Sequence, residues 1–137
     1  MIFIHWKLIS ETRSNSVITT TIFAMFFWTA YVNELLLANI IQTIFPDSIR
    51  QYRAKWLGKY IIDIFIPSKN IAVEYQEEQH YKPVKRFGGE IELNQQRLRD
   101  DIVRQKCKQN GIILIEWPYY DKVTEETVKK VFQQYVK

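Results

Sequence analysis

The 137-residue chain is poor in several residue types that carry protein chemistry, with one cysteine, two histidines, four glycines and four prolines. The single cysteine, Cys107, excludes an intramolecular disulfide and is typical of a reducing compartment, so we expect a cytoplasmic protein. The few histidines and the lone cysteine form no cluster with zinc-ligand spacing. No glycine-flanked nucleophile elbow is present either, so a Ser-His-Asp hydrolase has no support.

What the chain does contain argues for a folded protein with a polyanionic partner. It is 47% hydrophobic and 15% aromatic, which argues against disorder. The net charge is +4, yet residues 1–48 carry two basic and three acidic side chains, so the excess lies further along. A basic zone suits DNA or RNA as the partner. The residues expected to contact nucleic acid are Lys82, Lys85, Arg86, Arg97, Arg104 and Lys106.

The alternative for the helical part of this basic zone is a solvated face with internal ion pairs. Arg97 and Asp101 are four residues apart, as are Asp100 and Arg104. Such pairs lie next to each other on a helix surface.

The N-terminal region lacks charge, since residues 17–32 have none and approach the length of a membrane span. Four threonines and the following Asn33-Glu34 weaken that interpretation. We therefore expect residues 1–32 to form an apolar extension that packs on the core or in an oligomer interface, for example a homodimer, rather than in a membrane.

Hydrophobic periodicity predicts an α+β fold for residues 33–137, in the order αβββαβα, with a mixed central sheet flanked by helices. In the long second helix, Ile91, Leu98, Ile102 and Cys107 are expected near one buried stripe, with Gly111 as its C-terminal cap. Residues 3–9 have the composition of an appended edge strand. The helices are expected at 33–45, 90–110 and 124–135, and the strands at 49–56, 59–66, 71–76 and 112–117.

The most informative segment is a predicted hairpin around the turn Pro67-Ser68-Lys69-Asn70. Because strand side chains alternate, Asp63 shares a face with its apolar neighbours two residues away, and Glu74 shares a face with Gln76. A buried charge is costly unless it is paired or binds a metal. If the two faces coincide, they form a cation site; the alternative is a pair of solvated surface acids.

The order of motifs along residues 33–137 resembles the PD-(D/E)XK nuclease superfamily. The resemblance is to a branch related to very-short-patch-repair and phage homing endonucleases, with Gln76 in the place of the usual lysine. It implies a restriction-endonuclease-like fold and a Mg²⁺-dependent endonuclease that hydrolyses or nicks DNA, with Mn²⁺ substituting and RNA still open. The matching motifs are Asp63, Glu74-Tyr75-Gln76, Gln79-His80-Tyr81, Phe87-Gly88-Gly89, Arg99-Asp100, Cys107 and Asn110-Gly111-Ile112.

The resemblance also implies roles for individual residues. Asp63 and Glu74 would bind the metal, and Gln76 would orient the attacking water or the phosphate. His80 would act as general acid or base, unless it only anchors its loop. Glu34 would bring a further acid to the site, unless it only favours a helix N-terminus.

Two departures favour an alternative, a nuclease-fold module that binds nucleic acid without cutting it. Relatives carry glycine at the position of Glu77 and lysine at the position of Val103. Since Gln76 has no positive charge, we expect Lys82, Arg97 or Lys106 to supply one. Three tyrosines have two interpretations, base stacking or core packing; they are Tyr81, Tyr119 and Tyr120.

Overall fold

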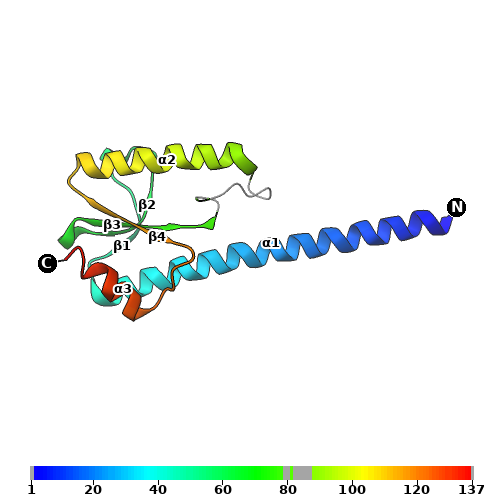
Figure 1. The fold of residues 1–137 in the computed structure, drawn as a ribbon, viewed down its shortest axis with the longest axis horizontal. Coiled ribbons are helices and arrows are strands. Elements are labelled where there is room, and N and C mark those ends of the chain that lie inside the picture. The colour runs from blue at the N-terminus through cyan, green and yellow to red at the C-terminus, as the bar shows by residue number, and fades with distance from the viewer. Residues whose placement is uncertain (1, 79–80, 82–87, 137) are drawn as a thin grey trace. The chain divides into compact units, whose positions relative to one another are not determined.

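The computed structural model describes residues 2–78, 81 and 88–136, and their side chains except for residues 2–16, 23 and 26. Seven regular elements follow one another, with short 3-10 turns at Lys55–Leu57 and Pro67–Lys69 (Figure 1). They are α1 (Ile2–Ile44), β1 (Ile49–Tyr52), β2 (Ile62–Ile66), β3 (Ile71–Gln76), α2 (Gly89–Gln109), β4 (Ile113–Pro118) and α3 (Glu125–Phe132).

The chain divides into two compact units, Met1–Val32 and Asn33–Lys137, and α1 passes through the boundary. Residues 3–9 lie in this helix, so the prediction of an edge strand there is wrong. A helix pairs its backbone groups within one segment, whereas an edge strand requires a neighbouring strand.

The first unit exposes its apolar side chains. Val17, Met25 and Trp28 are each about two-thirds exposed, and the Thr21 and Thr29 hydroxyls donate to carbonyls four residues earlier in the helix. By length and composition alone, Val17–Ile44 is long and apolar enough to cross a membrane. What covers residues 17–32 stays a prediction.

The second unit is built on one four-stranded mixed sheet in the order β1-β2-β3-β4. The first three strands are antiparallel, and β4 is parallel to β3 because α2 forms the crossover between them. This confirms the predicted α+β class and element order. β1 ends at Tyr52, earlier than predicted, because a 3-10 turn at Lys55–Leu57 and Gly58, at φ 66°, occupy the following chain. β2 starts at Ile62, three residues later than predicted.

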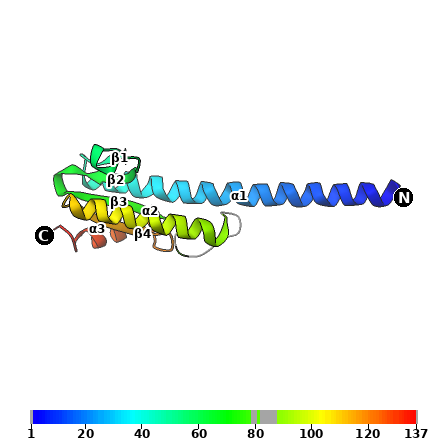
Figure 2. The ribbon, with the colours of Figure 1, turned by 90° about the horizontal axis from the view of Figure 1, so that it is seen from above.

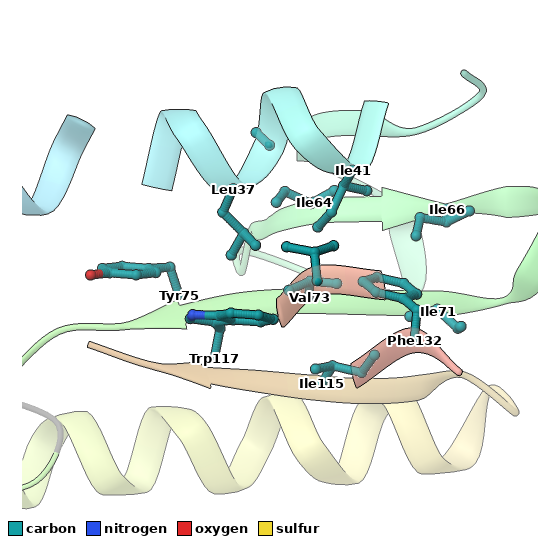
Figure 3. Close-up of a cluster of buried hydrophobic side chains, with 12 residues drawn as sticks. Leu37, Ile41, Ile64, Ile66, Ile71, Val73, Tyr75, Ile115, Trp117 and Phe132 are labelled. Atoms are coloured by element: carbon teal, nitrogen blue, oxygen red, sulfur yellow. The ribbon is translucent and has the colours of Figure 1, made fainter. Parts of the chain in front are cut away.

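One face of the sheet is covered by residues 33–44 of α1 and by α3, and a cluster of buried apolar side chains lies between them (Figure 3). Alternate strand residues such as Ile64 and Ile66, or Val73 and Tyr75, point to this side. Leu37 and Ile41 of α1 pack on them, as does Phe132 of α3. This layer is the main hydrophobic core.

The opposite face carries α2, which lies over the β3–β4 side of the sheet (Figures 1 and 2). Its buried members are Leu93, Val103 and Cys107, whereas Ile91 and Leu98 are 72% and 63% exposed. The predicted stripe is therefore wrong at both of these positions. α2 presents to the sheet the row 93, 96, 100, 103 and 107, which includes two polar residues and so escapes a search for apolar periodicity.

The ends of the helices follow known capping chemistry. Gly111, at φ 68°, lies just beyond α2, and the Ile112 amide donates back to the Cys107 carbonyl at 2.9 Å. The predicted cap is confirmed. Thr124 and Thr127 form a reciprocal capping box that starts α3.

Candidate functional site

The β2–β3 hairpin places Asp63 and Glu74 side by side. The Asp63 amide donates to Glu74 Oε1 at 3.3 Å, and the Tyr75 amide donates to Asp63 Oδ2 at 2.8 Å. Each carboxylate thus reaches the backbone of the other strand. Phe65 and Ala72, their neighbours on the same face, are buried in the cluster beneath α2. The two acids consequently lie on the α2 side of the sheet.

The proximity of the two acids changes how Glu74 ionises. Burial, and next the charge of Asp63, raise the pKa of Glu74 from 4.5 to about 8, against a lowering effect of Arg99. Asp100, beside Arg99 on α2, raises it as well. Near neutral pH this carboxyl group therefore holds a proton that a divalent cation would displace.

Glu34 approaches the same end of the sheet from α1. Burial and then the charge of Asp63 raise the pKa of Glu34 from 4.5 to about 7, and Glu77 contributes in the same direction. Gln51 donates to Glu34 Oε1 at 3.3 Å. Because α1 begins at Ile2, Glu34 lies inside the helix, so the alternative role of favouring a helix N-terminus is wrong.

Gln76 is buried at the end of β3 and is held in place by its neighbours. Its side-chain amide donates to Glu116 Oε1 at 2.8 Å, and Glu116 lies opposite Glu74 in the parallel β3–β4 pair. Arg104 of α2 donates to the same Glu116 oxygen at 2.8 Å and to Asp101 at 2.6 Å. The amide orientation of Gln76 is thereby fixed.

The structure places the remaining predicted basic residues differently. Arg97 is exposed, and the Lys106 ammonium donates to the Trp56 carbonyl at 3.2 Å. The ion pair of Arg104 with Asp101 is of the kind expected for a solvated helix face. His80, Lys82, Lys85 and Arg86 lie outside the described residues, and their roles stay predictions.

Sequence reasoning assigned no site role to Arg99, Asp100 or Glu116. The spacing of Gln96 and Asp100 places them on one helix row with Val103 and Cys107, but only the structure shows that this row faces the sheet. Gln96 donates to Asp100 at 2.9 Å. Glu116 could have been found from the alternation of β4, where it separates two buried residues, Ile115 and Trp117.

A pocket of about 420 Å³ opens beside Arg99, between α2 and the chain that enters β2. Leu98 and Ile102 line its apolar wall, and Lys59 lies over the Tyr60 ring at its rim. The exposed Leu98 therefore lines a pocket beside Arg99 and does not lie on a flat part of the helix surface.

The donors suit a hard cation, but they are few. Within the described part of the chain, no group of three or more histidine, cysteine or acidic side chains is placed to hold a metal ion. Mg²⁺ keeps several waters and is commonly bound by one or two carboxylates together with substrate phosphates. The adjacent Asp63 and Glu74 match that minimal set.

Comparison with known proteins finds viral relatives. The chain is 42% identical over 72 residues to Uncharacterized protein 094L of Frog virus 3 (isolate Goorha), covering 51% of this chain and 46% of that protein. It is 41% identical over 66 residues to Uncharacterized protein 033L of Invertebrate iridescent virus 3, covering 47% of this chain and 34% of that one. The chain thus matches less than half the length of these relatives.

A third relative, Uncharacterized protein 307L of Invertebrate iridescent virus 6, is 39% identical over 59 residues, covering 42% of this chain and 30% of that protein. No protein-family model matches the chain, and no solved structure matches it. A function must therefore be inferred from the chemistry of the site itself.

Proposed function

We propose that this protein is a metal-dependent endonuclease that hydrolyses or nicks phosphodiester bonds in DNA, on a restriction-endonuclease-like fold. The observation that carries the proposal is the pairing of Asp63 with the half-buried Glu74, bridged by bonds of 3.3 and 2.8 Å across the hairpin. A protein interior tolerates such a pair of acids only at a cost, and functional sites are where such costs are found.

In this proposal Asp63 and Glu74 bind Mg²⁺, which Mn²⁺ can replace. The ion would make a bound water nucleophilic at neutral pH and offset charge on the phosphate. Gln76, whose side-chain amide donates to Glu116, is assigned the task of orienting the attacking water or the phosphate. It cannot supply positive charge, so we assign that task to Arg99, whose charge already acts on Glu74.

Two groups are suited to move protons near neutral pH. Glu34 has its pKa raised to about 7 by burial and by Asp63, which is the range in which a general acid or base works best. His80 is the second, on the basis of the sequence resemblance.

The alternative proposal is a module that binds nucleic acid without cutting it. One observation favours it: Val103, at the position where the resembled nucleases carry lysine, is buried beneath the sheet. In place of the lysine ammonium group of the resembled nucleases, position 103 therefore carries an apolar side chain that packs in the core.

The test is incubation of the full chain with supercoiled plasmid and Mg²⁺ or Mn²⁺, beside Asp63→Asn and a matched control, Glu125→Gln. Glu125 is a surface acid paired with Lys129 on α3. We expect nicking by the wild type and the control, and none by Asp63→Asn. Retarded plasmid without cleavage in all three would replace the proposal by the binding module, and absence of both effects would reject both.

A further inference from the structure

Tyr81 and the adjacent residues Tyr119 and Tyr120, which lie far from it in the sequence, meet on the surface of the second unit. The ring centroid of Tyr81 lies 5.7 Å from that of Tyr119 and 5.6 Å from that of Tyr120, and the latter two are 5.3 Å apart. The rings are tilted or edge-on to one another, with interplanar angles of 54°, 58° and 78°. We call Tyr81, Tyr119 and Tyr120 the tyrosine cluster.

The cluster is not part of the hydrophobic core. Tyr81, Tyr119 and Tyr120 are 38%, 36% and 65% exposed. Of the three, Tyr120 shows most of its surface. A pocket of about 360 Å³, lined in part by Asn33, Tyr120 and Lys122, opens beside it. An exposed aromatic group next to polar side chains is suited to a ligand with a flat π face and polar edges.

The parallel pairing of β3 and β4 brings the tyrosine cluster to the end of the sheet at which Gln76 of the candidate site lies. β3 and β4 are parallel, and Gln76 lies opposite Pro118 at their ends, so the residues that follow both strands leave the same edge of the sheet. Tyr119 and Tyr120 come directly after that proline. Partial burial and then Tyr120, Glu116, Asp121 and Asp100 raise the pKa of Tyr81 to about 12. Two of these acids, Glu116 and Asp100, belong to the surroundings of Glu74 and Gln76.

We propose that the tyrosine cluster stacks on unpaired bases, and that the substrate is a single-stranded or locally opened nucleic acid. This inference rests on the proposed function and names its substrate class. Every base has a π face, so stacking on aromatic rings binds single strands with little sequence preference. In a duplex these faces are covered by neighbouring bases, and only edges and phosphates remain accessible. A substrate whose phosphate reaches Asp63 would thus present its adjacent bases to the cluster.

The experiment measures binding without cleavage, by fluorescence anisotropy in EDTA. The full chain is titrated with a labelled single strand of about 20 nucleotides, longer than a typical single-strand site, and with its duplex, using wild type, Tyr120→Ala, Tyr120→Phe and the control Tyr135→Ala. Tyr135 is an exposed tyrosine beyond α3. We expect the wild type to prefer the single strand, and Tyr120→Ala to weaken single-strand binding about 5- to 150-fold with little change for the duplex.

The conservative variant separates stacking of the ring from a hydrogen bond of the hydroxyl group. Tyr120→Phe keeps the ring and should retain single-strand affinity, as should the control. Equal affinity for both strand forms in the wild type, or an unchanged Tyr120→Ala, would overturn the inference. Equal losses in Tyr120→Ala and Tyr120→Phe would also overturn it, because they would assign the contact to the hydroxyl group. Thermal unfolding of each variant verifies that it is folded.

Failure of this inference is distinguishable from failure of the proposed function. Single-strand binding that depends on Tyr120, without cleavage of plasmid, would reject the nuclease and keep the cluster as a binding surface. Conversely, nicking that depends on Asp63 and is indifferent to Tyr120→Ala, together with equal strand affinities, would keep the nuclease and reject the cluster.

Discussion

The two faces of the central sheet differ although they are made from the same strands. The face under α1 and α3 carries the main apolar cluster, with Ile64, Val73 and Trp117 among its members (Figure 3). The face under α2 is apolar only in part, where Phe65 and Ala72 meet α2. At its other part it carries Asp63, Glu74, Gln76 and Glu116.

In our proposal, this difference separates stability from function. An apolar face stabilises the unit by removing side chains from water. The acidic part cannot do so, because burial of Glu74 beside Asp63 shifts its pKa upward and works against the charged form. Polar residues in such a position break the local rules of a good core, and natural proteins break these rules mainly at functional sites. Variants on each face can therefore test whether the two roles are separable.

The largest effect is expected on the acidic part of the α2 face. Asp63→Asn removes a charge but keeps the shape, so cleavage of plasmid should fall by about 10³-fold, because a positioned metal contributes several kcal/mol. Above about pH 8, where Glu74 is ionised, the midpoint of thermal unfolding should not decrease, since the like-charge repulsion between Asp63 and Glu74 is lost. A variant that cleaves normally, or one that unfolds, would place Asp63 among the structural residues.

The converse effect is expected on the apolar face. Phe132 is 3% exposed and its ring centroid lies 5.2 Å from that of Phe45. Phe132→Ala should lower the free energy of unfolding by about 3–5 kcal/mol, whereas the exposed Tyr135→Ala should change it by less than about 0.5 kcal/mol. Measured well below its unfolding temperature, Phe132→Ala should cleave at the wild-type rate per folded molecule. A large loss of rate would mean that the two faces are not separable.

The third prediction concerns pH and metal. Because burial and Asp63 raise the folded-state pKa of Glu74 from 4.5 to about 8, the folded chain binds more protons than the unfolded chain between these values. In EDTA the unfolding temperature should therefore fall as pH rises from about 5 to about 8 and then level off. Each pKa unit is worth about 1.4 kcal/mol, so the decline should be on the order of a few kcal/mol.

Mg²⁺ should oppose this decline, since it displaces the proton, and should stabilise the chain more at about pH 8 than at about pH 5. Glu74→Gln removes the titrating group and should flatten the profile. If unfolding temperature depends on pH in the same way in the wild type and in Glu74→Gln, both in EDTA, then the pKa of Glu74 is not raised in the folded chain.

The smallest effect is expected at Arg99. Arg99→Gln removes the charge that lowers the pKa of Glu74, so cleavage should fall by about tenfold, equivalent to ~1.4 kcal/mol. Arg97 is the matched control, because it is exposed on the same helix. Arg97→Gln should leave the cleavage rate of bound substrate unchanged. It should reduce by about 0.9 the slope with which the logarithm of the duplex-binding constant falls with the logarithm of salt concentration. Equal effects of the two variants would assign Arg99 to general phosphate contact.

Strand alternation predicted the hairpin and the residues that share a face with Asp63 and with Glu74 on each strand. That the two faces coincide was left as a condition, which the register of Ile64 with Val73 fulfils. Alternation succeeds because a period of two leaves only two faces, and β3 matches its predicted bounds. The buried face of α2 was harder to predict. Ile91 and Leu98 have the spacing of a buried stripe but are exposed, whereas Gln96 and Asp100 face the sheet. Sequence cannot show which row of a helix a neighbouring sheet will cover.

Contacts between residues far apart in the sequence could not be predicted either. The bond between Gln76 and Glu116 joins residues 40 positions apart, and only the parallel pairing of β3 and β4 brings them together. The start of α1 was missed for another reason. Residues 3–9 have strand-like composition, but helix continuity with the following apolar segment outweighs that local preference.

The most direct test of the central claim is a calorimetric titration of the full chain with Mn²⁺ near neutral pH, in two buffers of different ionisation enthalpy. If Asp63 and Glu74 share one cation, the wild type binds one Mn²⁺ per chain and releases protons, because Glu74 is largely protonated beforehand. Asp63→Asn and Glu74→Gln should each abolish that binding, and Glu125→Gln should not. Binding of Mn²⁺ that persists unchanged in both site variants, or no binding by the wild type, would contradict the account.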